Sequence, residues 1–261
     1  MIHIGTSGFS YDDWGGPFYP TGLAKSDWLR FYARTFDTVE LNASYYRMPD
    51  ARTLEAMVAK TPDDFRFTLK AHSSMTHVRD ADETIYRAFI AALAPWRERD
   101  QLGGVLAQFP PSFQHSEANL AYLMTLRERF GQLPLVVEIR HRSWIRPSFF
   151  EALREAHLGY CCVDEPRFRS LVPPVAEATA SPAYVRLHGR NAAKWWRHEQ
   201  AWERYDYRYS LQELAPWARR VRELEHEAGT VYVFANNHWQ GQAIDTAKQL
   251  RLLLEENPPA A

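Results

Sequence analysis

The stretch YVRLHGR, residues 184–190, decides the fold. It begins with β-branched and aromatic residues, which is typical of a buried strand, and it ends in charged and polar residues. Seven other runs share these features. The eight predicted strands are residues 2–5, 38–42, 66–70, 104–108, 135–138, 159–164, 184–188 and 231–236.

Helical patterns fill the spaces between the strands, and several begin at Ser, Asp or Pro, as helix starts prefer. The predicted helices are residues 26–35, 51–60, 83–99, 117–130, 147–156, 211–228 and 242–255. Only the connection after the sixth strand, residues 166–182, lacks a helical pattern, so we expect it to be irregular.

Eight strands that alternate with helices over 261 residues predict a single (β/α)₈ TIM barrel. We assign residues 1–256 to this one domain and residues 257–261 to a frayed C-terminal tail. The alternative is a Rossmann-like open sheet. It is disfavoured because the glycines of the segment GTSG, residues 5–8, lack the spacing of a dinucleotide-binding turn.

The composition, with 46% hydrophobic and 24% charged residues, is that of an ordinary globular protein. The net charge of −1 provides no global attraction to nucleic acid or to an anionic membrane, so any polyanion site has to be local. No signal peptide and no apolar stretch of about 18 residues is present. Cys161 and Cys162 are adjacent on a predicted strand and do not readily bridge each other. We therefore expect a cytoplasmic protein with no membrane partner.

The predicted strands end in polar side chains. In a TIM barrel the carboxyl ends of the strands form the active site, so these residues are the candidates for function. They are Glu40, Asn42, Lys70, Gln108, Glu138, Arg140, His141, Asp164, Arg186, His188, Arg190, Asn236 and Asn237. Since residues two apart share a face, Arg140 should point inward if Glu138 does. Structural ion pairing between neighbouring strands is the alternative to a functional role.

Aromatic residues are frequent in the loops after these strands, and the longest loop, residues 189–210, combines rings with cations. It is either a lid whose rings stack on bases or sugars, or a segment that packs onto the barrel. The aromatic candidates for ligand binding are Trp14, Tyr46, Trp144 and Tyr207.

Taken together, these motifs closely resemble the YecE-like family, known as domain of unknown function 72. The resemblance rests on the segment GTSG with Tyr11, Trp14 and FYP at 18–20, on Glu40, Asn42 and Tyr46, on Lys70 with Thr76 and His77, on Gln108, on Glu138 with RH at 140–141 and SW at 143–144, on Asp164, on RLHGR at 186–190, on Tyr205 and Tyr207, and on NN at 236–237. It extends from the first strand to the last helix and departs only at Ser44, Tyr45 and Ala235. It implies a TIM barrel and no established reaction.

The first functional hypothesis is binding or processing of a phosphate-bearing or otherwise anionic ligand, with nucleic acid included. Arginine suits phosphate because its planar guanidinium can donate two parallel hydrogen bonds. Lys70, Arg140, Arg186 and Arg190 would hold the anion. The candidate catalytic residues are Glu40, Lys70, Glu138 and His188, with His188 or Glu138 as acid or base. A hydrolase or an isomerase would use such groups.

Three alternatives remain open at this point. Glu40 and Glu138 could be the carboxylate pair of a glycosidase, which a structure with both paired to arginine would exclude. A divalent metal could bind Glu40, Glu138, Asp164 and His188, as in isomerase-like or endonuclease IV-like barrels, although the nearby arginines oppose it. The third alternative is a non-catalytic binding protein. No organic cofactor is predicted, and the sequence does not identify a protein partner.

Overall fold

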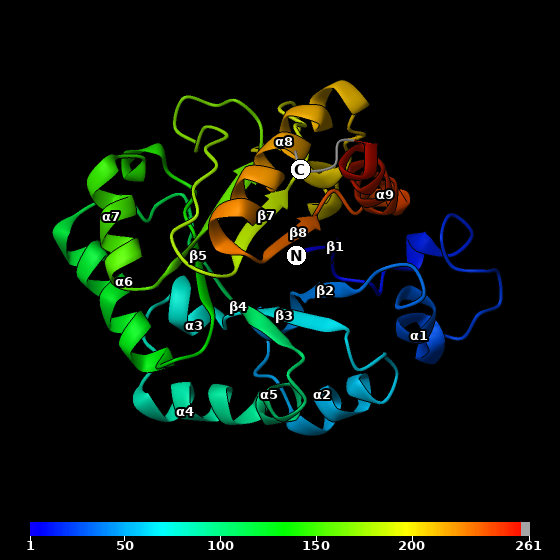
Figure 1. Cartoon of the computed structure of the whole chain (residues 1–261), viewed down its shortest axis with the longest axis horizontal. Coiled ribbons are helices and arrows are strands. Elements are labelled where there is room, and N and C mark those ends of the chain that lie inside the picture. Colours follow the sequence, from blue (N-terminus) through cyan, green and yellow to red (C-terminus); the bar gives the residue numbers. More distant parts are fainter. Residues whose placement is uncertain (257–261) are drawn as a thin grey trace.

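The structure, a computed structural model, describes residues 1–256. Eight parallel strands form a closed barrel in chain order, and helices surround it (Figure 1). The strands are β1 (Ile2–Ser7), β2 (Thr38–Leu41), β3 (Arg66–Lys70), β4 (Leu102–Gln108), β5 (Leu135–Glu138), β6 (Gly159–Asp164), β7 (Ala183–Leu187) and β8 (Val231–Ala235). Strand β8 pairs with β1 and closes the barrel. The predicted TIM barrel is confirmed, while the predicted tail at 257–261 lies outside the described residues.

The helices follow the predicted order with two differences. They are α1 (Trp28–Tyr32), α2 (Ala51–Val58), α3 (Ser73–Thr76), α4 (Glu83–Ala92), α5 (Ala94–Glu98), α6 (Glu117–Phe130), α7 (Pro147–Glu155), α8 (Leu211–Ala228) and α9 (Gln242–Glu256). The predicted helix at 83–99 is divided at Leu93, because Pro95 lacks an N–H group and its ring clashes with the preceding turn. The short helix α3 was not predicted. No helix among the described residues is long and apolar enough to cross a membrane.

The connection after β6 is irregular, as predicted. Residues 165–182, all of which the structure describes, contain neither helix nor strand. The segment is held to the barrel by side chains: Val172 packs into the barrel interior, and the hydroxyl of Thr179 donates to the carbonyl of Leu158 at 2.6 Å. It therefore replaces the missing helix as a cover for this part of the barrel.

Two apolar layers stabilise the barrel, one inside it and one between the strands and the helices. The inner layer consists of Leu106, Val136, Cys161, Val163, Val172, Tyr184, Tyr232 and Phe234. The larger outer layer includes residues such as Val137, Cys162 and Val185, which alternate with the inner ones along the same strands. This alternation determines which polar residues at the strand ends enter the barrel mouth.

Gly5 allows β1 and β2 to approach each other closely. A Cβ atom at this position would lie 2.1 Å from the carbonyl oxygen of Thr38, which is far inside van der Waals contact. Any side chain here would therefore separate the two strands near the site where their ends contribute Ser7 and Glu40.

We expect the substitution Gly5→Ala to lower the free energy of unfolding by about 2–4 kcal/mol, because backbone atoms of β2 would have to move. Urea unfolding followed by circular dichroism measures this loss. Gly15→Ala is the control, since its Cβ would meet its nearest atom, the carbonyl oxygen of Asp12, at 3.3 Å. Equal losses in the two variants would contradict this explanation of Gly5.

Candidate functional site

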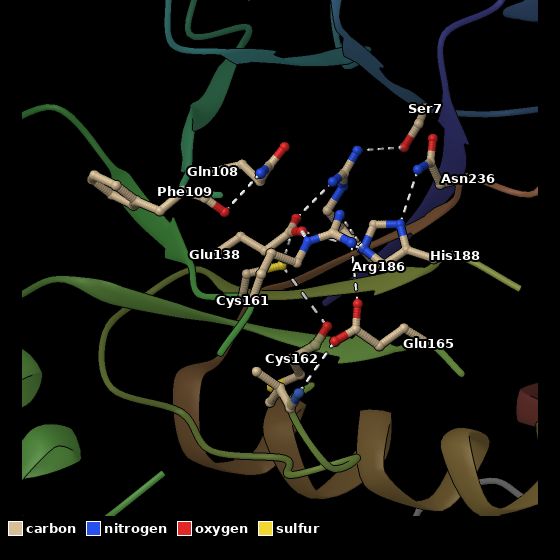
Figure 2. A network of polar contacts seen from close by, with 12 residues as sticks. Ser7, Gln108, Phe109, Glu138, Cys161, Cys162, Glu165, Arg186, His188 and Asn236 are labelled. Carbon is tan, nitrogen blue, oxygen red and sulfur yellow. Dashed lines mark hydrogen bonds and ion pairs between the residues drawn. The ribbon is translucent and has the colours of Figure 1, made fainter. Parts of the chain in front are cut away.

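Polar side chains from all eight strands, or from the residue just after them, converge at the carboxyl end of the barrel, and Figure 2 shows most of them. They follow the inward-facing apolar residues at intervals of two, as strand alternation requires. The set comprises Ser7, Glu40, Lys70, Gln108, Glu138, Arg140, Glu165, Arg186, His188 and Asn236. Most of these residues were predicted from their positions at strand ends.

The guanidinium of Arg186 is the centre of this arrangement. Its Nη1 donates to Oε2 of Glu138 at 2.6 Å, and its Nη2 donates to Oε1 of Glu40 at 2.7 Å and to Oγ of Ser7 at 3.4 Å. The hydroxyl of Tyr184 donates to the other oxygen of Glu40 at 2.8 Å. One arginine thus joins carboxylates from β2 and β5, strands that lie far apart around the barrel.

Arg140 forms the second half of the network. Its Nε donates to Glu138, and its Nη1 donates to Oε2 of Glu165 at 3.1 Å. Burial alone would raise the pKa of Glu138, but the charges of Arg140 and Arg186 hold it well below its usual range. Glu138 and Arg140 do share the inward face, as the alternation predicted.

His188 is fully buried beside these charges. The amide of Asn236 lies 2.9 Å from its Nδ1, and its Nε2 lies 3.3 Å from Oε1 of Glu138. The same Nε2 also lies 3.1 Å from Nη2 of Arg140, which can only donate, so this nitrogen contacts both a donor and an acceptor. Burial and the charge of Arg140 lower the pKa of His188 to about 3. At this pKa the imidazole is neutral at physiological pH.

Glu165 belongs to the network, although its neighbour Asp164 was the predicted site residue. Its other oxygen accepts from the backbone N–H of Val172 at 3.3 Å, and burial raises its pKa to about 7. The signal was present in the sequence, because Glu165 continues the inward alternation of Cys161 and Val163.

Asp164 instead points out of the barrel toward α8. Its two oxygens accept from Arg190, each at 2.7 Å, and it also accepts from Trp217 and from the hydroxyl of Tyr209. Arg190 additionally pairs with Glu213 at 3.2 Å. The structure therefore separates Asp164 and Arg190 from the mouth and uses them to join β6, the loop after β7 and α8.

Five other predicted residues also make packing or anchoring contacts. The buried indoles of Trp14 and Trp144 donate to the carbonyls of His238 and Phe113, each at 2.7 Å. His141 accepts from the backbone N–H of Ser143 and so begins the turn after β5. The remaining two, Tyr207 and Asn237, contact helices: Tyr207 donates to Glu213, and Asn237 donates to Thr246 at 2.8 Å.

A pocket of about 470 Å³ opens above the ionic network. Seven predicted residues line it: Asn42, Tyr46, Lys70, Gln108, Arg140, Arg186 and Asn236. The pocket is also lined by residues that were not predicted as site residues, namely Tyr11, Tyr45, Trp202, Tyr205 and His238. The long aromatic loop packs onto the barrel and also encloses the pocket. Trp195 is buried, whereas Trp202 forms part of the pocket wall and stacks on Trp239 with 3.6 Å between the ring centroids.

Lys70 is the exception in this otherwise paired mouth. Among the described residues no carboxylate oxygen lies within 4.0 Å of its Nζ, which instead lies 4.1 Å from the centroid of the Tyr45 ring. Burial and the positive charge of Arg186 lower its pKa to about 7.

The charges of the mouth nearly cancel. Arg140 and Arg186 are balanced by Glu40, Glu138 and Glu165, so two of the cations that were predicted to hold an anion are instead paired within the protein. Glu40 and Glu138, the carboxylates of the glycosidase alternative, are both paired to Arg186. This pairing excludes the glycosidase alternative. Among the described residues that line the pocket, Lys70 is the cation without a carboxylate partner.

The proposed metal ligands do not form a metal site. Within residues 1–256, no group of three His, Cys, Asp or Glu side chains is arranged to hold a metal ion. Of the predicted set, Asp164 faces the helices and Glu40 faces Arg186, so only Glu138 and His188 are neighbours. The chemistry of the donor set therefore does not fit a divalent cation.

Fold and site together define a (β/α)₈ barrel with a charged, half-enclosed pocket at the carboxyl ends of its strands. The chain belongs to the family described as protein of unknown function DUF72, whose model matches residues 3–261. It is 37% identical to the UPF0759 protein YunF of Bacillus subtilis, over 98% of this chain and 95% of that protein. Escherichia coli YecE is 29% identical over 58% of this chain and 50% of its own length.

Solved structures of the family have the same fold. A DUF72 family protein from Thermotoga maritima superposes with a TM-score of 0.90 at 41% identity, covering 98% of this chain and 99% of that chain. A second, from Enterococcus faecalis, gives a TM-score of 0.86 at 30% identity and covers both chains fully. The predicted membership in this family is confirmed.

We expect Arg186→Met to lower the free energy of unfolding by at least about 3 kcal/mol, because it leaves two buried carboxylates without their shared cation. Urea unfolding at pH 7 measures the loss. The matched control is Arg208→Met, which breaks an exposed pair with Asp245 and should cost less than about 1 kcal/mol. Similar losses in both variants would contradict the central role given to Arg186.

Proposed function

We propose that the pocket at the barrel mouth binds a small anionic ligand, of which a phosphate-bearing metabolite is the favoured class. The observation that carries this proposal is Lys70, a cation without a carboxylate partner among the described residues, in a pocket of about 470 Å³. Pockets of about 300–1,000 Å³ are typical of small-molecule sites.

Electrostatic cost supports the proposal. A partly buried ammonium without a counter-charge is unfavourable, and this cost appears here as the lowered pKa of Lys70. An anion bound beside Nζ would supply the missing charge and favour protonation of the amine. Binding of an anion would therefore remove the electrostatic cost of an ammonium without a counter-charge.

The neighbours of Lys70 suit an oxyanion. The amides of Asn42 and Gln108 line the same pocket and can donate hydrogen bonds without adding charge. Arg140 and Arg186 also line it, but their donors are largely engaged by Glu40, Glu138 and Glu165. In this proposal the arginines contribute mainly their positive potential, and Lys70 makes the direct contact.

The observations give less support to the other functions. A glycosidase needs a carboxylic acid that holds its proton near neutrality, whereas the pKa of Glu138 is lowered. A nucleic acid could enter this pocket only with a single phosphate or nucleotide, and the thermal-shift test below includes an oligonucleotide for this reason. An open pocket with an unpaired lysine also favours a chemical role over a purely structural one.

We expect millimolar sulfate, inorganic phosphate and a sugar phosphate to raise the melting temperature, measured by differential scanning fluorimetry at constant ionic strength. Lys70→Met should abolish the shift, and Lys248→Met, which removes an exposed lysine, should leave it unchanged. A shift produced by an oligonucleotide alone would favour a nucleic-acid ligand. No shift with any of these anions would overturn the proposal.

The sulfate effect should weaken as pH rises through 7, because sulfate keeps its charge while Lys70 loses its proton. Glu165 also titrates near this pH, and its deprotonation would act in the same direction. We expect Glu165→Gln to retain most of the pH dependence and Lys70→Arg to leave only the part that Glu165 contributes. Titration by calorimetry at pH 6 and pH 9 measures the change, and equal affinities would contradict the role of Lys70.

A further inference from the structure

Lys70 differs chemically from the other lysines of the chain. The sequence contains five, at positions 25, 60, 70, 194 and 248. Lys25 and Lys194 pair with Asp12 and Glu203, and Lys248 is exposed. Lys70 alone among them lines the mouth pocket.

We propose that Lys70 forms an imine with an aldehyde or ketone group of the anionic ligand, an inference that rests on the proposed function. The geometry that carries it is an amine at the end of β3, open to a pocket, flanked by two neutral amides and without a carboxylate partner. The ligand class is thereby narrowed to small anionic carbonyl compounds.

The reaction is a condensation that needs no oxidant or reductant. The nitrogen lone pair attacks the carbonyl carbon, a C–N bond forms, and the oxygen takes a proton as the nitrogen loses one. A proton from the solvent then converts the carbinolamine hydroxyl into water, which leaves as the nitrogen lone pair forms the C=N bond, and the nitrogen keeps its remaining hydrogen. The product is a protonated imine, whose positive charge attracts the anionic part of the ligand after the bond has formed.

The amine is available for this attack at neutral pH. With a pKa of about 7, Lys70 is neutral in about half of the molecules at pH 7, whereas an ordinary lysine is neutral in fewer than one in about a thousand. The groups whose charges face it are Glu40, Glu138, Arg140 and Arg186, together with the neighbours Tyr45 and His77. Among these, burial and the charge of Lys70 lower the pKa of His77 to about 4, so it does not add a competing titration near 7.

Other nucleophiles near the mouth are less suited to this role. Cys161 and Cys162 are fully buried, and burial raises the pKa of each thiol, so neither is a thiolate at neutral pH. His188 is fully buried within the ionic network. Among the described residues that line the pocket, Lys70 is therefore the side chain with the primary amine that an imine requires.

The test treats the full chain at pH 7 with glyoxylate, a small anionic aldehyde, and with cyanoborohydride, which reduces an imine to a stable secondary amine. Peptide mass mapping follows all five lysines. We expect Lys70 to be modified at least about tenfold faster than Lys248, because a larger fraction of its amine is neutral. Sulfate should slow the modification of Lys70 and leave Lys248 unaffected.

Two variants separate this inference from the proposed function. Lys70→Arg keeps the positive charge but cannot form a stable imine, so it should retain the sulfate-induced rise in melting temperature and lose the fast modification. Lys248→Met should retain both. The rise in melting temperature also shows that the Lys70→Arg variant is folded.

The outcomes are distinct. Modification of Lys70 no faster than that of Lys248, with the sulfate effect intact, overturns the imine and leaves anion binding in place. Equally fast modification of Lys70 by glyoxylate and by uncharged acetaldehyde, without protection by sulfate, supports the reactive amine and overturns the anionic ligand.

Discussion

The guanidinium of Arg186, buried in the barrel mouth between Glu40 and Glu138, is the interaction on which the rest of the site depends. A buried arginine is costly unless its charge and its donors are satisfied. Here the two Nη atoms bond to partners from β1, β2 and β5, while the buried Nε has no hydrogen-bond partner among the described residues. Because β5 lies far around the barrel from the neighbouring strands β1 and β2, these contacts join separate parts of the mouth. Arg140 connects the network to the end of β6 in the same way, through its ion pair with Glu165.

This network also explains why so many charges produce so little net field. The arginines and carboxylates satisfy one another within hydrogen-bond distance, and His188 stays neutral among them. Below the network, the hydroxyl of Tyr184 links Glu40 to Thr68 and so forms a transition to the apolar interior. The ionic network thus forms a polar layer at the base of the pocket.

The sequence was sufficient for the barrel and for the inward face of β5, because both follow from periodicity. Glu165 could have been found in the same way, by counting from Cys161 and Val163, whereas Asp164 was predicted because it is the last residue of the predicted strand. The bridge from Glu40 through Arg186 to Glu138 could not be predicted. It depends on the tilt and stagger of the closed barrel, which bring β2 and β5 to one guanidinium.

Strand register accounts for the isolation of Lys70. Glu40 lies opposite Thr68, so the inward position beside Lys70 on β2 is Asn42, one layer above the carboxylate. On β4, Lys70 lies opposite Leu106, and the next inward residue toward the mouth is Gln108. A carboxylate at either position would have paired the lysine and raised its pKa, whereas the two amides leave it charged only in part. The arginines below, which hold the carboxylates, add repulsion without adding a partner. The same register that completes the ionic network therefore leaves the amine of Lys70 without a carboxylate partner among residues 1–256.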